Sequence, residues 1–224
     1  MLKGKGTFTP LQRQLFSDLG NIPDINNFYL TGGTALAEFF LGHRHSYDLG
    51  LFTHERGLLI PFLTVLERGL NEASYLTKVI RRFESFVELQ VEQGGENVQI
   101  HLAYDSPFRF EAPQPSEFGV NINDYKDITV DKLLTFFGRW THRDAIDLFF
   151  ILKKESIDNL LGIAKQKDPG FDLYWFAVAL NQVEDFPDNI EKWPVDMLIE
   201  VDAEELKKDF LNLSQYVMGK IKKG

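Results

Sequence analysis

In the first half of this chain, segments whose hydrophobic residues have the spacing of a strand are interspersed with segments that have the spacing of a helix. This pattern predicts a mixed α/β structure. Short apolar or alternating runs, typical of strands, occupy five segments: 28–30, 48–52, 75–83, 85–92 and 98–104. Hydrophobic residues at helical spacing occupy three others: 10–19, 35–41 and 56–71. Because these segments are interleaved along the chain, we expect a small sheet with flanking helices.

Residues at the ends of the segments support these elements. Thr9 and Pro10 are a favourable helix opening, since a hydroxyl caps the first turn and proline suits the first helical position. Gly42 is suited to end the second of the three helices. Pro61 either kinks the third helix or marks its true start.

After residue 116 the pattern becomes helical. Prolines make segment 106–116 an irregular loop and the best candidate for a domain boundary. Helical spacing then marks five segments: 130–137, 143–153, 157–166, 173–183 and 203–221. We therefore expect an α+β fold, with an α/β core over 1–116 and a helical region packed on it over 117–224. The aromatic run 174–176 lies inside a helical pattern and is expected to be core.

The chain has a net charge of −9, from 24 basic and 33 acidic residues. Non-specific binding to nucleic acid depends on a large positive surface, so we do not expect this protein to wrap a long duplex. A local basic strip is still available where four cations lie close in sequence: Arg139, Arg143, Lys153 and Lys154. An acidic protein of this kind is able to bind a nucleotide through a metal ion and a few well-placed cations.

The composition also bears on the compartment. Cysteine is absent, which excludes disulfides and thiolate metal sites. No apolar run approaches the roughly 18 residues that a membrane span requires. The basic N-terminus is not followed by a continuous apolar segment and does not resemble a signal peptide. We therefore expect a cytoplasmic protein that has no membrane association.

The segment 28–49 carries the clearest chemical pattern: a strand, a glycine pair, a helix and a second strand that starts at an acid. The consecutive glycines Gly32 and Gly33 let the backbone approach a ligand closely. The helix after them presents free N–H groups and the positive end of its dipole, which suit a phosphate. Asp48 is then placed to hold a divalent cation beside the phosphates. The alternative interpretation of a glycine pair before a helix is a tight turn without a ligand.

The complete string is more specific than its parts. Gly-Gly-Thr-Ala-Leu-Ala at 32–37 is followed by Gly-His-Arg-His-Ser-Tyr-Asp-Leu at 42–49. This string resembles the phosphate-binding motif of the AbiEii/AbiGii toxin-like family in the nucleotidyltransferase superfamily. The resemblance extends to the Lys-Leu-Leu run at 132–134, to Arg139 and to Arg-Asp-Ala-Ile-Asp-Leu-Phe at 143–149.

The resemblance implies a nucleotidyltransferase-like mixed sheet and assigns roles to individual residues. It implies a nucleotide-binding set of six residues: Gly32, Gly33, Thr34, Arg44, Ser46 and Lys132. It implies a catalytic set of four residues: Asp48, Lys132, Asp144 and Asp147. In these roles Asp48 holds the cation and Lys132 offsets the phosphate charge. Asp144 or Asp147 orients or deprotonates the acceptor.

The chain departs from the family pattern at two metal-binding positions. The family's Asp-x-Asp places two carboxylates on one face of a strand, but its second position here is Gly50. A third carboxylate is expected on the neighbouring strand, where the pattern places His101. The metal candidates are thus Asp48 and His101. Histidine prefers softer metals than magnesium, so we expect weak Mg²⁺ binding unless Asp105, Asp144 or Asp147 completes the cluster.

Structural alternatives stay open for the residues of the helical half. Lys132 is either a phosphate contact or a solvated lysine on a helix. Asp144 and Asp147 lie three residues apart on one helix face. They are either active-site carboxylates or members of a surface ion pair with Arg139 or Arg143.

The resemblance implies metal-dependent transfer of a nucleotide from a nucleoside triphosphate to an RNA acceptor, tRNA included, or to a protein acceptor, with Mg²⁺ as the cofactor. It also implies that the protein is the toxin of a toxin–antitoxin pair and has an antitoxin as a partner. The missing carboxylates favour a second hypothesis from another class. In it, the same fold is a catalytically inactive nucleotide-binding or protein-interaction module.

Overall fold

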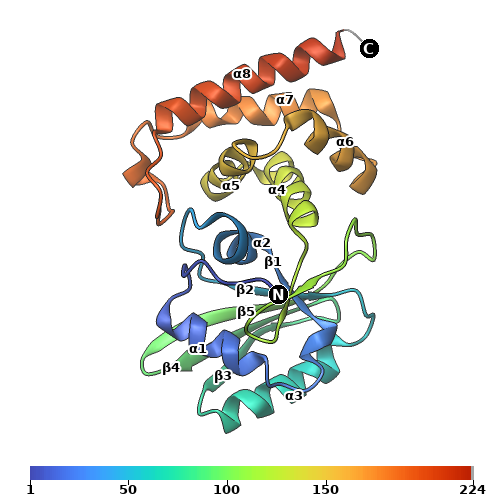
Figure 1. Cartoon of the computed structure of the whole chain (residues 1–224), viewed down its shortest axis with the longest axis vertical. Coiled ribbons are helices and arrows are strands. Elements are labelled where there is room, and N and C mark those ends of the chain that lie inside the picture. The colour runs from blue at the N-terminus through green and yellow to red at the C-terminus, as the bar shows by residue number, and fades with distance from the viewer. Residues whose placement is uncertain (223–224) are drawn as a thin grey trace. The chain divides into compact units, whose positions relative to one another are not determined.

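The computed structural model describes residues 1–222 of the chain and contains two compact units, Met1–Tyr125 and Lys126–Gly224 (Figure 1). The first unit contains a sheet with its helices, and the second is helical. The sequence pattern placed the boundary at residue 116, but strand β7 (Asn121–Ile122) lies after that residue and pairs with strand β1 (Tyr29–Thr31).

Among the described residues, the first unit has a seven-stranded sheet in the order β3-β4-β5-β2-β1-β7-β6. Its other strands are β2 (Leu49–Thr53), β3 (Leu76–Arg82), β4 (Phe86–Gln93), β5 (Glu96–Tyr104) and β6 (Gln114–Pro115). β2 pairs in parallel with β5 and antiparallel to β1, so the mixed sheet expected from the sequence is confirmed. The sequence pattern does not predict β6 and β7, because a strand of two residues is too short to show an alternation of apolar and polar positions.

One face of the sheet is apolar and packs against α1 (Pro10–Leu19) and α3 (Leu59–Glu72), which lie together below the sheet in Figure 1. Its centre consists of fully buried residues from β2, β5 and β4: Leu49, Leu51, Ile100, Leu102, Val87 and Leu89. The opposite face, which we call the open face, carries the alternate residues of the same strands, including Gly50 on β2 and His101 on β5. Along β5, Val98, Ile100 and Leu102 are accordingly buried, while Gln99 and His101 between them are partly exposed.

The N-terminal helix begins where the sequence predicts. Thr9 Oγ1 accepts a hydrogen bond from the backbone N–H of Gln12 at 3.1 Å, and the Gln12 side chain accepts one from the Thr9 backbone at 3.0 Å. Gln12 Nε2 also donates to the carbonyl of Ser46 at 2.8 Å, which ties α1 to the segment before β2. Pro61 lies in the first turn of α3, so it marks the start of this helix and does not kink it.

The helix at the glycine pair differs from the prediction. α2 (Gly32–Ala35) begins at Gly32 itself, so both glycines lie in its first turn and do not precede it. The chain continues as a π-helix over Leu36–Leu41 and ends at Gly42, whose φ of 69° is left-handed. π-helical segments are rare and are frequently found at functional sites.

Glu38 in this π-helix is fully buried and holds the N-terminal segment in place. Its carboxylate accepts hydrogen bonds from the backbone N–H of Phe8 at 3.0 Å and of Gly6 at 3.2 Å. It also accepts the Thr7 hydroxyl at 2.8 Å and the Thr7 backbone N–H. A buried carboxylate needs such donors to replace its lost hydration. Glu38 therefore anchors residues 6–8 of the N-terminal segment.

We expect Glu38→Gln to lower the free energy of unfolding by roughly 2–3 kcal/mol, because the amide puts a donor where the backbone N–H groups need an acceptor. Urea unfolding followed by circular dichroism measures the change. Glu72→Gln, at the exposed end of α3, is the matched control and should have no effect. Equal stability of the two variants would contradict the anchoring role of Glu38.

The second unit is built from the helices that the sequence predicts. They are α4 (Tyr125–Arg139), α5 (His142–Leu152), α6 (Ile157–Lys167), α7 (Leu173–Asn181) and α8 (Ala203–Ile221). Its core is aromatic, with the Phe136 ring centre 5.3 Å from that of Phe210 and 6.5 Å from that of Phe176. The prediction that 174–176 is core is wrong for Tyr174 and Trp175, which are 48% and 61% exposed, because α7 turns Phe176 inward and these two outward.

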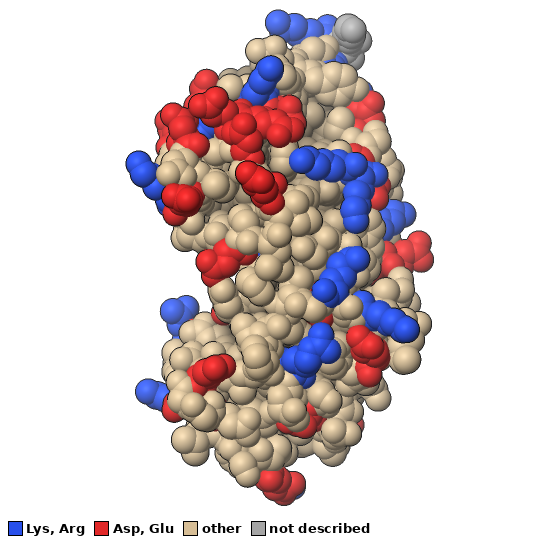
Figure 2. Space-filling model, turned by 60° about the vertical axis from the view of Figure 1, so that its left-hand side comes forward, with Lys and Arg blue, Asp and Glu red and all other residues tan. Residues whose placement is uncertain are grey.

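The charges of the helical unit are unevenly distributed. Figure 2 shows acidic side chains gathered on this unit, in the upper part of the view. Segment 184–205 contains one lysine and nine acids: Glu184, Asp185, Asp188, Glu191, Asp196, Glu200, Asp202, Glu204 and Glu205. Such a surface repels a nucleic-acid backbone. None of the helices in residues 1–222 combines the length and the apolar character that crossing a membrane requires.

His142, at the start of α5, is packed among aromatic rings. Its ring stacks on Phe186 with 4.2 Å between centres and lies 5.0 Å from Trp193. Burial lowers the pKa of His142 below its ordinary value. Its Nε2 is buried without a hydrogen-bond partner in the part of the chain that the structure describes. The folded state therefore favours the neutral ring.

We expect the helical unit to lose stability as the pH falls below about 6.5, because the unfolded chain then binds a proton that the folded chain takes up only at lower pH. The loss should stay under about 1 kcal/mol, since the ring is partly exposed and water screens its charge. All three tryptophans lie in this unit, so tryptophan fluorescence during urea unfolding reports on it. His142→Phe should remove this part of the pH dependence, and an unchanged dependence in that variant contradicts the assignment.

Candidate functional site

The two glycines at the start of α2 are required for different physical reasons. Gly32 has a φ of 76°, a left-handed conformation that residues with a Cβ atom rarely adopt. Gly33 lacks such a φ, but a Cβ atom there would lie 2.5 Å from Nη2 of Arg44 and 3.2 Å from Oγ of Ser46. Polar atoms thus approach the backbone closely at Gly33. This is the property that a phosphate site at a helix N-terminus needs.

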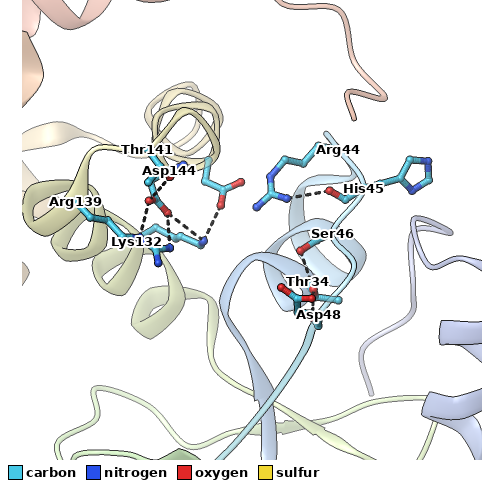
Figure 3. A network of polar contacts seen from close by, with 10 residues as sticks. Thr34, Arg44, His45, Ser46, Asp48, Lys132, Arg139, Thr141 and Asp144 are labelled. Carbon is cyan, nitrogen blue, oxygen red and sulfur yellow. Dashed lines mark hydrogen bonds and ion pairs between the residues drawn. The ribbon is translucent and has the colours of Figure 1, made fainter. Parts of the chain in front are cut away.

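A hydroxyl network joins this turn to the start of β2 (Figure 3). Thr34 Oγ1 lies 2.8 Å from Ser46 Oγ, and it donates to the carbonyl of Asp48. Because a hydroxyl has one proton and a carbonyl only accepts, the Ser46 hydroxyl is the donor in its contact with Thr34. The network therefore fixes the backbone at Asp48 relative to the first turn of α2.

Arg44 places a buried guanidinium beside Gly33. Its Nη1 donates to the carbonyl of His45 at 2.9 Å (Figure 3). The His45 ring interacts instead with the N-terminal segment, where its Nδ1 lies 2.8 Å from the carbonyl oxygen of Thr7. The sequence prediction that Arg44 contacts phosphate is compatible with this geometry, since the cation and the first turn of α2 are adjacent.

The strand register places three residues in one row across neighbouring strands of the open face: Thr31, Gly50 and His101. Gly50 is the Cα partner of Thr31 on β1 and of His101 on β5. Asp48 lies two residues before Gly50 and therefore points to the same face. Asp48 is half-buried, and its carboxylate makes no hydrogen bond or ion pair among residues 1–222. The resemblance described above implies three acids at positions 48, 50 and 101, and the chain has one carboxylate, one glycine and one imidazole there.

The other acids near this row are already paired. Glu88 on β4 is the Cα partner of His101, a neighbour that only the strand register reveals. Its carboxylate forms an ion pair with Arg81 at 3.2 Å. Asp105 follows β5 and accepts the Tyr29 hydroxyl at 2.6 Å. The described residues contain no group of three or more His, Cys, Asp or Glu side chains that could hold a metal ion.

Lys132, in α4 of the helical unit, is buried, so the alternative of a solvated lysine is wrong. Its Nζ forms an ion pair with Oδ2 of Asp147 at 2.7 Å and lies 3.9 Å from Oδ1 of Asp144. Both acids are buried on α5. These acids are therefore ion-paired, and they are buried because the helix face they share turns inward. The ion pair with Arg139 that the sequence offered as an alternative is present at Asp144.

Asp144 is held by a second cation and by a hydroxyl (Figure 3). Arg139 donates from Nε to Oδ2 at 2.8 Å and from Nη2 to Oδ1 at 3.1 Å. Thr141, the N-cap of α5, donates from Oγ1 to Oδ2 at 2.6 Å. Trp140 has a φ of 31°, a strained conformation at the sharp turn that brings Arg139 back to the start of α5. Arg143, by contrast, is exposed.

This environment determines what Asp144 can do chemically. Burial by itself raises its pKa, but the hydrogen bonds from Arg139 and Thr141 and the charge of Lys132 hold the pKa below its ordinary value. The hydrogen bond to Asp144 also raises the pKa of Arg139. A general base works best when its pKa lies near the operating pH. Asp144 is therefore a poor proton acceptor at neutral pH and suits a positioning or electrostatic role.

We expect Asp147→Leu alone to lower the free energy of unfolding by roughly 3–5 kcal/mol, because it leaves the Lys132 ammonium buried without its close partner. Adding Lys132→Met should recover most of this loss, since replacing both members of a buried pair by apolar groups is close to neutral. Urea unfolding followed by tryptophan fluorescence measures the cycle. Additive effects of the two substitutions would show that the pair does not stabilise the unit.

The sequence of this chain is similar to a known protein family and to a protein from Aquifex aeolicus. The model of a family described as nucleotidyl transferase AbiEii toxin, type IV TA system, matches residues 13–173. The uncharacterized protein aq_aa25 of Aquifex aeolicus (strain VF5) is 25% identical over 177 residues, which cover 78% of this chain and 82% of that protein.

Solved structures with the same fold come from two further organisms. A Helicobacter pylori protein assigned as a nucleotidyltransferase superposes with a TM-score of 0.61 at 19% identity, covering 95% of this chain and 94% of that chain. MenT4, the nucleotidyltransferase toxin Rv2826c of Mycobacterium tuberculosis H37Rv, superposes with a TM-score of 0.56 at 15% identity, covering 93% and 82%. At these identities the likeness concerns the fold, and the predicted α+β nucleotidyltransferase-like fold is confirmed.

Proposed function

This chain belongs to the AbiEii family of nucleotidyl transferase toxins, and we propose that it transfers a nucleotide from a nucleoside triphosphate to an RNA acceptor, tRNA included, or to a protein acceptor. We propose further that an antitoxin is its partner. The observation that carries the proposal is the hydroxyl network of Thr34, Ser46 and Asp48 beside the two glycines. This network supports the proposal because it holds a backbone suited to phosphate and a carboxylate in one segment.

In the proposed complex the triphosphate lies at the first turn of α2. Gly32 and Gly33 let its oxygens approach the backbone N–H groups, whose dipoles favour an anion. The hydroxyls of Thr34 and Ser46 are further polar contacts. Arg44, already beside Gly33, offsets the phosphate charge.

The contribution of the helical unit is proposed from the family pattern and from the local chemistry of its residues. Lys132 is the second phosphate contact. When the triphosphate binds, the Lys132 ammonium leaves its ion pair with Asp147 and contacts a phosphate oxygen. Asp144 or Asp147 orients the acceptor. For Asp144 we propose positioning and not deprotonation, because its pKa is lowered.

The chain supplies one carboxylate, Asp48, for the Mg²⁺ of the proposed reaction. Magnesium is commonly bound by one or two carboxylates together with substrate phosphates, so Asp48 suits one cation shared with the triphosphate. Gly50 offers no ligand, and the His101 imidazole is a poor ligand for magnesium. These residues do not fit a pair of cations, which would clamp the attacking and leaving oxygens. We therefore propose that transfer by the wild-type protein is weak.

The second candidate function is a catalytically inactive module that binds a nucleotide or another protein on the same fold. The row of Thr31, Gly50 and His101 favours it, because none of these three residues is an acid. Fold does not decide between the two functions, since activity depends on the site itself.

We expect Gly50→Asp and His101→Asp together to raise transfer of labelled nucleotide to total RNA or protein by at least about tenfold, a gain of roughly 1.4 kcal/mol in transition-state stabilisation. Each acid alone should have little effect, because one added carboxylate does not hold two cations, and groups that act as a unit are strongly non-additive. Position 50 accepts a Cβ atom, which would be in ordinary contact with Phe52 at 3.5 Å and the Thr31 carbonyl at 3.6 Å.

The matched control is Gly50→Asn with His101→Asn, which has the same shape without the charge. Calorimetric titration with Mg²⁺ and a nucleoside triphosphate should show poor binding to the wild type and tighter binding to the double aspartate variant. Robust wild-type transfer that is abolished by Asp48→Ala would refute the weakened metal site. Triphosphate binding without transfer in any variant would favour the inactive module.

A further inference from the structure

A loop of the first unit, residues 105–113, carries a cation that the proposed reaction does not use. Arg109 stacks on Tyr29, with its guanidinium carbon 3.8 Å from the centre of the ring. Its Nη1 is 3.4 Å from Oδ1 of Asn123, which is long for a hydrogen bond. Its Nε and Nη2 are buried, and neither has a hydrogen-bond partner among residues 1–222. Leaving such donors unsatisfied costs free energy.

Arg139 shows what these two donors are able to bind. It uses the same edge of its guanidinium, Nε and Nη2, to hold both carboxylate oxygens of Asp144 at 2.8 and 3.1 Å. The geometry of this edge fits the oxygens of a phosphate as well as those of a carboxylate. Because no acid of the described chain pairs with that edge of Arg109, the edge suits an anion that a ligand supplies.

Arg109 lies over the open face, close to the row that contains Gly50. The Tyr29 ring beneath it belongs to β1, where Tyr29 is the Cα partner of Phe52 and Thr31 is the partner of Gly50. Residues two apart on a strand share a face and are about 7 Å apart. Along the open face, the position of Tyr29 beneath Arg109 is therefore about 7 Å from Gly50 and about twice as far from Asp48, a distance of roughly two nucleotide units.

Aromatic side chains flank Arg109 in the same loop. Phe108 is 43% exposed and packs edge-on against Phe110, with 5.2 Å between ring centres. Exposed rings next to a guanidinium are typical of sites for single-stranded nucleic acid, because bases stack on the rings and phosphates pair with the cation. With a net charge of −9 the protein has to rely on such local contacts for any nucleic acid.

We propose that Arg109 binds a backbone phosphate of a single-stranded RNA acceptor and that Phe108 stacks on a neighbouring base. The proposal rests on the proposed function, since it names the acceptor class and the residues that hold it. Binding includes a movement of loop 105–113 away from Tyr29, because Nε and Nη2 are buried in the free protein. The triphosphate of the donor nucleotide offers the same phosphate chemistry, so the experiment separates the two sources.

The experiment titrates the full-length protein with a short fluorescein-labelled single-stranded RNA and, separately, with a nucleoside triphosphate. Arg109→Met keeps an aliphatic stack on Tyr29 and removes the donors, so we expect RNA binding to weaken about tenfold or more. The slope of log affinity against log salt should fall by about one, and the triphosphate affinity should not change. Phe108→Ala should weaken RNA binding about fivefold or more. The control Arg68→Met, an exposed position on α3 at the other face of the sheet, should change neither affinity.

Thermal unfolding separates a binding role from a structural one. Arg109→Met removes unsatisfied buried donors, so Tm should stay the same or rise, whereas loss of a structural arginine lowers it. Equal RNA affinity of Arg109→Met and Arg68→Met overturns the proposal, and so does the absence of RNA binding by the wild type. A loss of triphosphate affinity alone assigns Arg109 to the donor nucleotide and also overturns it.

Two further outcomes distinguish the inference from the function on which it rests. Labelled nucleotide that is transferred to protein, equally by wild type and Arg109→Met, assigns a protein acceptor and overturns the RNA assignment. If the protein binds no triphosphate but binds RNA in a way that depends on Arg109, the proposed function fails while the Arg109 site stands.

Discussion

Parallel pairing of β2 with β5 is the constraint on which the first unit depends. It sets Leu49 beside Ile100 and Leu51 beside Leu102 in the buried core, and the same register sets Gly50 beside His101 on the open face. A shift of one residue would exchange the two faces and expose the leucines to water. The adjacency of positions 50 and 101 is therefore enforced by the packing of the core, whatever side chains stand there.

Charged side chains in this protein differ in whether other residues of the chain supply their hydrogen-bond and ion-pair partners. Glu38 is surrounded by backbone donors, and Asp144 is held by Arg139 and Thr141. These groups are stabilised within the fold, and their charges are used there. Asp48 and Arg109 contrast with them, because the described residues supply no ion pair to either. This contrast is the physical reason for assigning external ligands, a cation and a phosphate, to these two side chains.

Local rules account for much of what could be predicted about the fold. Thr9 caps α1, and the long alternating and helical patterns gave the main strands and helices, since each needs only its own residues. The predictions fail where contacts between residues distant in sequence determine burial or strand pairing. Tyr174 and Trp175 share a helical pattern with Phe176, but only the packing of α7 selects which ring turns inward. The two-residue strands β6 and β7 form because the edge of β1 is available for pairing with β7. No local sequence pattern indicates this pairing.

In the candidate site, too, some features follow from the sequence alone and others from the tertiary structure. The sequence by itself determined the glycine pair, Asp48 and the absence of an acid at position 50, because residue identity and spacing along one strand are properties of the chain alone. Only the tertiary structure decided that Glu88, the neighbour of His101, forms an ion pair with Arg81. Such pairings depend on strand register and on the distance between atoms from distant segments, and those quantities arise only when the segments pack together.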